Sequence, residues 1–582
     1  GTLTQELSYG IVSNALNWKE VSSQLTVAGM TEKLTELTKL VKKTVDVFSF
    51  NDFHGNVLES GKNIGAAKLA GVINSYRGMV NDEYEVIPVT AGDLYQGTAI
   101  SNIKYGDPVT DMLKAMGIEV SAIGNHEYDW GSNRIAKWAE DGGFEFLAAN
   151  IVKKGTDIAV DYAQPYKIID RNGAKIAFIG IATPETAVKT LAANVKDIEF
   201  LDPIKVVDKY VDIVKGEGAD AVVVLAHSAA YQDKDTKVIT GEAADIAKVD
   251  GVDAVISGHN HAFVAGTVDR AGKAIPVVQG GYNGRGLAQL RFTFDNDNNL
   301  LNIDPSVNEL YKNVATLPVD QEVADKIKVH SDELAPMMAE VVTTTETELS
   351  HEGRNDGVTP LGVIVAETMR QIAGTQIGLT NGGGIRRTLD AGDITVGDMY
   401  EILPFDNTLV TVKVTGEELV KIIEHGINTD GFGWGQFAGI KVWYDAKTGK
   451  VSSIRLDDGT KIDPKTEYSV VINDFMLTGG DGYDFSKATD TKDTFVVMRD
   501  AMANNWKENG IPKVDYNVLV AGVDDTVDPE EPVKPEEKPE KPNKPGKLPQ
   551  TGAPIGADMV AMMGITAVAV GGFVYKRRKK NA

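Results

Sequence analysis

The sequence predicts an α/β protein whose central strands are buried on both faces. Short apolar runs alternate with helical stretches over residues 44–305, as expected when helices cover a largely parallel sheet. Polar residues follow the carboxyl ends of these runs, which is where such sheets bind ligands. A smaller unit with a similar pattern occupies residues 343–523. The linker before it, residues 306–342, has helical spacing from residue 317 onward.

Composition limits the classes of function. The chain has 582 residues, enough for several domains, and its 42% hydrophobic and 24% charged residues are typical of a soluble globular protein. The net charge of -24 argues against nonspecific nucleic-acid binding, which needs a basic surface. Because there is no cysteine, disulfides are excluded and any metal must be bound by nitrogen and oxygen. The chain begins at Gly1, which we interpret as a removed leader or a cut from a longer chain.

The elements follow in order along the chain. Residues 1–43 contain one expected amphipathic helix, at 31–43, to which we assign no function. Buried strands are expected at 45–50, 84–90, 120–123, 174–182, 219–226, 252–256 and 275–278. A polar connection is expected at 295–305, before the long helix.

The most informative stretch is the octapeptide at residues 124–131, which follows the apolar run at 120–123. It offers an amide oxygen (Asn125), an imidazole (His126) and a carboxylate (Asp129) within five positions. Four further clusters stand behind apolar runs, at residues 51–54, 92–93, 226–227 and 258–261. Together the clusters hold five of the eight histidines, at positions 54, 126, 227, 259 and 261. This pattern predicts a hydrolase site that binds two metal ions.

Two divalent ions suit these residue types. Ions about 3.5–4 Å apart can clamp an in-line phosphoryl displacement, with one activating water and both neutralising charge. They require a bridging carboxylate and nitrogen or oxygen ligands. Manganese, zinc, magnesium and cobalt all accept such ligands, so the identity of the metal stays open.

The five clusters resemble the calcineurin-like metallophosphoesterases, whose pattern is D-x-H, G-D, G-N-H-(E/D), H and G-H-x-H. The resemblance implies a four-layer α/β/β/α sandwich followed by a smaller α/β substrate-binding domain. It also implies Asp52, His54 and His261 as ligands of one metal, Asn125, His227 and His259 as ligands of the other, and Asp93 as the bridge. His126 would stabilise the attacked phosphoryl group or protonate the leaving oxygen, and Asp129 would orient it.

Residues 44–523 together resemble the 5′-nucleotidase family, which pairs this metal domain with a C-terminal substrate domain. The match lies in the glycine-rich block at residues 381–387, where Asn381 would contact the nucleoside, Gly383 would let the backbone approach the ligand, and Arg386 would bind phosphate. Arg354 stands near the position of a second phosphate-binding arginine, although its surroundings depart from the family pattern. Arg387 is equally explained as a surface residue.

The family holds the base between two aromatic rings and the ribose with an aspartate. Phe475 and Asp481 match one ring and that aspartate. Trp434, two residues before Gln436, matches the second ring, and Phe437 is the alternative if the register shifts. Stacking accepts every base, which implies broad nucleobase use.

The C-terminal residues carry an anchoring signal. Residues 524–547 are rich in proline, glutamate and lysine and predict an extended spacer. Residues 548–582 then contain Leu548-Pro549-Gln550-Thr551-Gly552, an apolar stretch and a basic cluster. This order resembles the LPxTG signal of Gram-positive surface proteins, which implies transient retention in the membrane, cleavage between Thr551 and Gly552 by sortase, and attachment to peptidoglycan outside the cell. The alternative is a plain transmembrane anchor.

We therefore expect a wall-anchored ecto-5′-nucleotidase that hydrolyses nucleoside monophosphates, foremost AMP and conceivably ADP and ATP, with metal-activated water. Two enzyme alternatives share the metal clusters: a 2′,3′-cyclic-nucleotide phosphodiesterase with 3′-nucleotidase activity, and a UDP-sugar hydrolase. An alternative of another class is a catalytically idle adhesin on the same scaffold.

Overall fold

The computed structural model describes residues 43–429, 431 and 433–526. The helix expected at 31–43, most of the spacer and the whole sorting signal therefore lie outside the described residues. Among the helices within the described ranges, none is both long and apolar enough to cross a bilayer.

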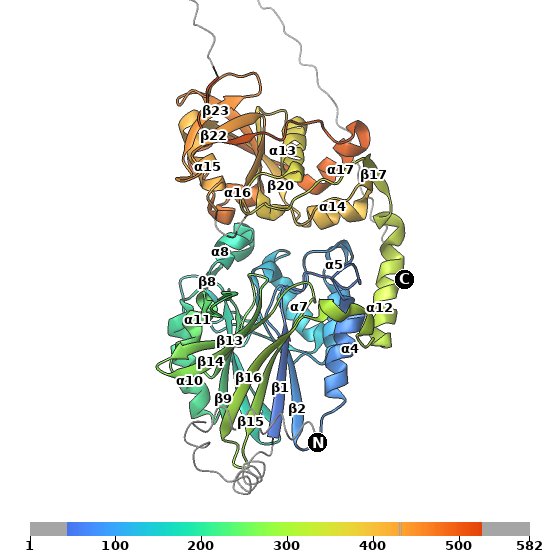
Figure 1. The fold of residues 1–582 in the computed structure, drawn as a ribbon, viewed down its shortest axis with the longest axis vertical. Helices are drawn as coiled ribbons and strands as arrows, with labels where there is room; N and C mark the ends of the chain where they lie inside the picture. Colours follow the sequence, from blue (N-terminus) through green and yellow to red (C-terminus); the bar gives the residue numbers. More distant parts are fainter. Residues whose placement is uncertain (1–42, 430, 432, 527–582) are drawn as a thin grey trace, which may run out of the picture. The chain divides into compact units, whose positions relative to one another are not determined.

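The first sheet has six strands in the order β16-β15-β1-β2-β3-β4. Its four parallel strands are β1 (Lys43–Phe50), β2 (Tyr84–Thr90), β3 (Val120–Ala122) and β4 (Glu145–Leu147). The antiparallel strands β15 (Leu287–Phe294) and β16 (Leu300–Asn308) lie beside β1 (Figure 1). The connection expected at 295–305 is thus wrong, because only the turn at 295–299 is polar loop and the rest continues as a paired strand.

The second sheet also has six strands, in the order β13-β14-β12-β9-β7-β6. Its parallel strands are β7 (Ala174–Ala182), β9 (Ala221–His227), β12 (Ala254–Ile256) and β14 (Lys273–Gly280). The edge strands β6 (Tyr166–Arg171) and β13 (Phe263–Arg270) pair antiparallel to their neighbours. Parallel strands direct their carboxyl ends to one edge of a sheet.

The two sheets pack face to face and helices cover their outer faces. Side chains such as Val47 and Phe178 form the core between the sheets. Helices α4 (Gly65–Arg77), α6 (Asp107–Met116) and α7 (Asn133–Gly142) pack on the first sheet, and α10 (Pro203–Gly216) and α11 (Glu242–Ala247) on the second. The expected four-layer sandwich is confirmed.

A long helix, α12 (Gln321–Met338), lies within the range expected to be helical and packs on α4 through Val323 and Ile327. Residues beyond it form a five-stranded sheet of order β21-β18-β24-β20-β25. The strands are β18 (Ile377–Asn381), β20 (Thr408–Thr415), β21 (Gly435–Ala438), β24 (Glu467–Asn473) and β25 (Thr489–Val497). The helices are α13 (Pro360–Ala373), α14 (Val396–Ile402), α15 (Gly416–Gly426), α16 (Asp474–Leu477) and α17 (Met498–Asn509). The domain boundaries expected from the sequence stay predictions.

Shorter elements complete the description. They are β5 (Ile151–Lys153), β8 (Ile198–Phe200), β10 (Tyr231–Gln232), β11 (Ile239–Thr240), β17 (Val341–Thr345), β19 (Gly392–Thr395), β22 (Ile440–Tyr444), β23 (Val451–Leu456), β26 (Leu519–Ala521), α5 (Ala99–Ile103), α8 (Thr186–Lys189), α9 (Ala192–Val195) and the 3₁₀ turns η1 (Asn125–Tyr128), η2 (Leu310–Thr316), η3 (Gly382–Gly384) and η4 (Gly480–Gly482).

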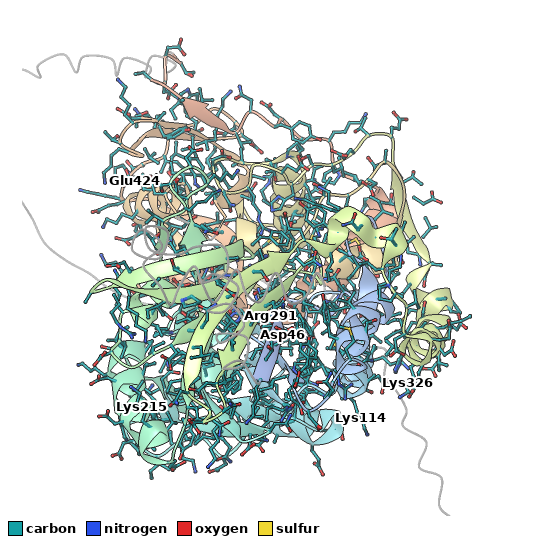
Figure 2. The ribbon with its side chains drawn as sticks, turned by 60° about the horizontal axis from the view of Figure 1, so that its bottom comes forward. Asp46, Lys114, Lys215, Arg291, Lys326 and Glu424 are labelled. Atoms are coloured by element: carbon teal, nitrogen blue, oxygen red, sulfur yellow. The ribbon has the colours of Figure 1, made fainter. Side chains whose placement is uncertain are left out.

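One ion pair ties β1 to β15. Asp46 is fully buried, and Arg291 on the neighbouring strand donates to both of its oxygens at 2.8 and 2.9 Å (Figure 2). The Tyr84 hydroxyl donates a third hydrogen bond to this carboxylate at 2.6 Å. Two guanidinium nitrogens of Arg291 and the hydroxyl of Tyr84 therefore share the Asp46 carboxylate as their acceptor.

We expect Asp46→Ala to lower the free energy of unfolding by about 1.5–3 kcal/mol, because it leaves the Arg291 and Tyr84 donors without their acceptor. Thermal unfolding followed by calorimetry measures this loss. Glu322→Ala is the control, since it removes an exposed ion pair with Lys326 on α12 that should contribute less than about 1 kcal/mol. Equal shifts for the two variants would contradict the importance of the buried pair.

Candidate metal centre

The candidate ligands stand at the carboxyl ends of parallel strands in both sheets. Asp52 follows β1, Asp93 follows β2 and Asn125 follows β3, while His227 ends β9 and His259 follows β12. Because the two sheets pack face to face, these strand ends meet, and residues up to about 200 positions apart come into contact. The sequence clusters thus form one site.

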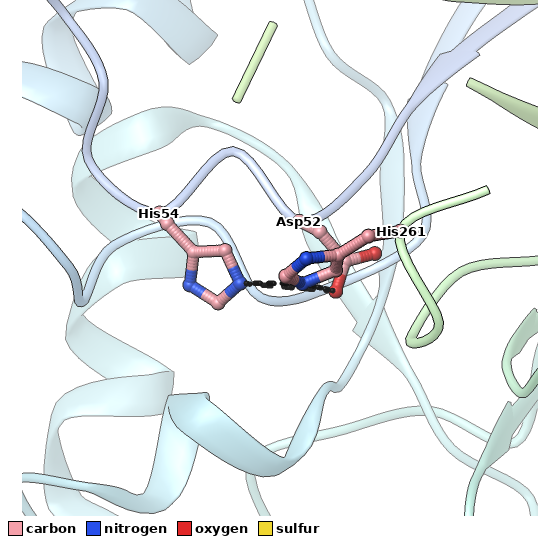
Figure 3. A group of neighbouring side chains, drawn as sticks. All are labelled: Asp52, His54 and His261. Atoms are coloured by element: carbon pink, nitrogen blue, oxygen red, sulfur yellow. Dashed lines mark hydrogen bonds and ion pairs between the residues drawn. The ribbon is translucent and has the colours of Figure 1, made fainter. Parts of the chain in front are cut away.

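The first group comprises Asp52, His54 and His261, whose potential ligand atoms lie within 4.8 Å of one another (Figure 3). The Nε2 atoms of His54 and His261 are 3.1 Å apart, and His261 Nε2 lies 3.3 Å from Asp52 Oδ1. Asp52 Oδ1 is buried and has no hydrogen-bond partner among the described residues. A buried carboxylate oxygen without a donor is costly, and a cation bound here would remove that cost.

The second group comprises Asp93, His227 and His259, with ligand atoms again within 4.8 Å. His227 Nε2 lies 3.1 Å from Asp93 Oδ2 and 3.2 Å from the side-chain oxygen of Asn125. Burial opposes a charge on His227, but Asp93 and Asp52 outweigh it and raise the pKa of this histidine to about 10. The same two carboxylates would attract a divalent cation. Both groups therefore fit divalent metals bound by nitrogen and oxygen.

Backbone carbonyls set the orientation of two histidines. His54 Nδ1 donates to the Gln96 carbonyl oxygen at 2.9 Å, and His227 Nδ1 donates to that of Ala91 at 2.7 Å. With Nδ1 fixed as the donor, Nε2 is in each ring the nitrogen left to bind a metal, which in His227 would displace the proton that Asp93 and Asp52 stabilise; metal-binding histidines are usually held in this way. Burial lowers the pKa of His54 to about 3, so its ring stays neutral and able to bind a metal.

The backbone of the site is strained. Five of the candidate ligands have positive φ angles: Asp52 at 49°, His54 at 49°, Asp93 at 56°, His259 at 81° and His261 at 57°. A non-glycine residue in this region costs on the order of 1–3 kcal/mol and persists only where the surrounding structure enforces it. Such strain gathers at functional sites, and its concentration here is independent support for this one.

Glu127 is a supporting residue that sequence reasoning missed. Its side chain is fully buried and accepts hydrogen bonds from the backbone N–H groups of Asp93, Leu94 and Gly124, at 2.8, 2.8 and 2.6 Å. It thereby holds the turn after β2 against the turn after β3. Its place in the octapeptide was visible, but a backbone contact over more than 30 residues leaves no local signal.

His126 and Asp129 form a pair beside the metal groups. His126 Nδ1 donates to Asp129 Oδ2 at 2.8 Å, and Asp129 Oδ1 accepts from the Thr190 hydroxyl at 3.0 Å. Burial opposes protonation of His126, but Asp129 and Asp93 outweigh it and raise its pKa above the ordinary value. Asp129 thus fixes one ring nitrogen, and the other is free to meet a ligand.

A cavity of about 600 Å³ adjoins the metal groups and is large enough for a small-molecule ligand. The predicted residues that line it are Asp93, Asn125, His126, Asp129, His259, His261, Arg354, Asn381, Gly383, Arg386, Phe475 and Asp481. Asn381 donates to Asp481 at 2.8 Å, so the two candidate nucleoside contacts are joined. Burial, with Arg386 nearby, lowers the pKa of Arg354 to about 10, which indicates two crowded cations.

Two predicted aromatic residues are not brought to this cavity. Phe437 is fully buried in the core of the second part, because β21 directs its side chain inward, so our prediction for it is wrong. Trp434 is not among the lining residues of the described chain, and its ring contacts Tyr444 edge to face; its role at the base stays a prediction.

Phe405 is an aromatic residue of the cavity wall that the sequence did not single out. It lines the cavity together with Phe475, and its ring centroid is 5.5 Å from that of His126 at an interplanar angle of 26°. The loop is fixed by Asn102, whose side chain donates to the Pro404 carbonyl oxygen at 2.9 Å. The sequence signal was the apolar Leu403-Pro404-Phe405 between α14 and β20, to which we assigned no role.

Comparison with known proteins identifies the parts of the chain. Residues 47–263 match the model of the calcineurin-like phosphoesterases, residues 340–488 that of the 5′-nucleotidase C-terminal domain, and residues 540–582 that of the LPXTG cell wall anchor motif. The fold and the site thus define a calcineurin-like phosphoesterase. Its second domain is that of the 5′-nucleotidases, so the chain is 5′-nucleotidase-like in its domain composition, and its anchor motif assigns it to the cell wall, outside the cell.

Several proteins are similar over much of the chain. The chain is 32% identical to endonuclease YhcR of Bacillus subtilis. The match covers 67% of this chain but only 32% of that protein. The chain is 27% identical to cell wall protein Lmo0130 of Listeria monocytogenes (81% of this chain, 69% of the relative) and 28% identical to a snake venom 5′-nucleotidase of Gloydius brevicauda (75% and 81%). A 5′-nucleotidase precursor from Thermus thermophilus shares the fold, with a TM-score of 0.72, 24% identity and coverage of 82% of this chain and 99% of that one.

We expect Asp129→Asn to lower phosphoester hydrolysis by about 10²–10⁴-fold, because the imidazole of His126 loses the carboxylate that orients and charges it. Metal content, measured by elemental analysis, should stay at the wild-type level. Asp141→Asn is the control, since it changes a carboxylate on the surface that pairs with exposed Lys137. Full activity of Asp129→Asn would exclude a catalytic role for the pair.

Proposed function

We propose that this protein is a cell-wall-anchored ecto-5′-nucleotidase that hydrolyses nucleoside 5′-monophosphates, foremost AMP, to nucleoside and phosphate. The observation that carries the proposal is a single cavity that joins two groups of metal-binding side chains to two arginines and two phenylalanines. The metal groups suit the phosphate, the arginines suit its negative charge, and the phenylalanines suit the base of one nucleotide. The similarity to a snake venom 5′-nucleotidase over 75% of the chain supports it.

The metal ligands follow from the two groups. Asp52, His54 and His261 would hold one divalent ion, and His227 and His259, grouped with Asp93 and with Asn125 beside His227, would hold the other. The family resemblance would make Asp93 the ligand that the two ions share. When bound, such a pair activates water and neutralises charge on the phosphoryl group. Manganese, zinc, magnesium and cobalt all suit these ligands.

The protein's own groups bind and stabilise the phosphoryl group. Arg354 and Arg386 line the cavity and offer planar, bidentate donors to phosphate oxygens. His126, positioned by Asp129, donates its remaining ring proton toward the phosphoryl group or the leaving oxygen. Both arginines lie in the second part of the chain and the histidine in the first, so the reacting group is held from both sides.

Phe405 and Phe475 would hold the base, with Asp481 and Asn381 on the ribose. The two rings lie on opposite elements, a loop after α14 and the helix α16, and both line the cavity. Asp481 is almost fully buried and is fixed by Asn381 at 2.8 Å. Stacking makes few demands on base identity, so other nucleoside monophosphates should also be substrates.

The direct test is phosphate release by the purified full chain with manganese. AMP, ADP, ATP and 2′,3′-cyclic AMP are assayed in parallel and then again with EDTA. We expect AMP to have the highest kcat/KM and EDTA to abolish turnover. Preference for the cyclic substrate would favour a phosphodiesterase with 3′-nucleotidase activity, and no turnover of any nucleotide would favour an idle adhesin.

Substitution of single aromatic residues tests which rings stack on the base. We expect Phe405→Ala to raise KM for AMP about 5- to 150-fold, since one stacked ring contributes about 1–3 kcal/mol. Trp434→Ala tests the rival assignment, because the sequence predicts that ring for the base although it is absent from the cavity lining in the described chain. A larger effect for Trp434→Ala than for Phe405→Ala on KM would restore the original assignment.

A further inference from the structure

Glu185 contacts the metal centre from outside the sequence motifs. It is the residue before α8, three positions beyond the end of β7, and its Oε2 lies 2.7 Å from His259 Nε2. The His259 side chain is 10% exposed, whereas that of Glu185 is 52% exposed, so the carboxylate reaches the ring from the solvent side. The ring therefore has Nε2 engaged by Glu185, while the residue also belongs to the group with Asp93 and His227.

This contact determines where the proton of the His259 ring resides. An ionised carboxylate only accepts hydrogen bonds, so Nε2 must carry the proton that it donates to Glu185. The lone pair then lies on Nδ1. His54 and His227 are held in the opposite way, with Nδ1 protonated by contact with carbonyl oxygens and Nε2 available. Each of the three rings thus has a separate partner that selects its tautomer.

We propose that Glu185 is a positioning residue, which holds His259 with Nδ1 available to the second metal. The proposal rests on the proposed metal ligands and adds a residue to them. Carboxylates that accept from a metal-bound histidine orient the ring and raise its basicity, and their loss typically weakens metal binding about 10–100-fold. Glu185 therefore sets the affinity of the second site and has no direct effect on the first.

The segment that carries Glu185 is well suited to this task. The Thr186 hydroxyl donates to the Thr183 carbonyl oxygen at 2.7 Å, which fixes the turn between β7 and α8. At the other end of α8, the Lys189 carbonyl oxygen accepts from the Asn125 side chain at 3.5 Å. Because the amide nitrogen of Asn125 faces Lys189, its oxygen faces His227 and the second metal group. One short segment thus orients two ligands of the same metal.

Metal titration of the full chain tests the proposal. The metal-free protein is titrated with Mn²⁺, and free Mn²⁺ is counted by electron paramagnetic resonance. We expect the wild type to bind two ions and Glu185→Ala to weaken one site about 10–100-fold while the other is unchanged. Glu185→Gln should be intermediate, since its amide oxygen still accepts from Nε2 but carries no charge.

Glu242→Gln is the matched control, because Glu242 is a nearby carboxylate that accepts from the Ser228 hydroxyl and, within the described part of the chain, makes no hydrogen bond to a proposed metal ligand. It should bind both ions as the wild type does. Two unchanged sites in Glu185→Ala, or equal weakening in Glu242→Gln, would overturn the proposal. So would a fall in both sites accompanied by a lower melting temperature of the metal-free chain, which would indicate a general structural role.

The ring ¹⁵N shifts of His259 in the metal-free protein provide a second readout. They should report the Nε2-protonated tautomer in the wild type and a mixture in Glu185→Ala, and identical shifts in both would contradict the assignment. Failure of the proposed function can be distinguished from failure of this inference. A wild type that binds two ions but hydrolyses no nucleotide overturns the nucleotidase, while the effect of Glu185 on Mn²⁺ affinity still decides this inference.

Discussion

The carboxylate of Asp93 is the group on which the rest of the site depends. It is 2% exposed, its Oδ2 contacts His227 on the second sheet, and its Oδ1 accepts from the backbone of His126 at 2.9 Å. Burial opposes ionisation, but His227 and His126 hold the pKa of Asp93 well below its usual range. A buried charge is tolerated only when it is paired. Because the buried charge of Asp93 needs these partners, strand ends of both sheets and the octapeptide at residues 124–131 must lie together around it.

The geometry around Asp93 explains why the fold needs two sheets. A single parallel sheet brings its strand ends to one edge, but gives ligands from one side only. Here the ends of β2 and β3 face those of β9 and β12 across the core between the sheets. The strained turns after these strands place the side chains, and the packed core beneath them enforces the strain.

The fold class and the clustering of the candidate metal ligands were predictable from the sequence because both have local signals. An apolar run followed by Asp, His or Asn is visible within a few residues, and the sheet topology then brings such ends together. The aromatic contacts were not predictable in this way. Phe437 and Gln436 alternate along β21, and the sequence alone does not tell which cavity or core each faces. Phe405, Glu127 and Glu185 act through contacts with residues far away in the chain, which leave no pattern near the residues themselves.

The stacking of Phe405 on His126 has a consequence for biosynthesis and export. About 280 residues separate the two rings, and Phe475 follows 70 positions later still. The amino-terminal half carries every metal ligand, yet the walls that would hold a nucleotide belong to the half that is made last. On the proposed function, a chain that is still emerging from the ribosome or the translocon lacks a complete pocket. Nucleotide hydrolysis would thus require that the second domain has been made and has folded onto the first.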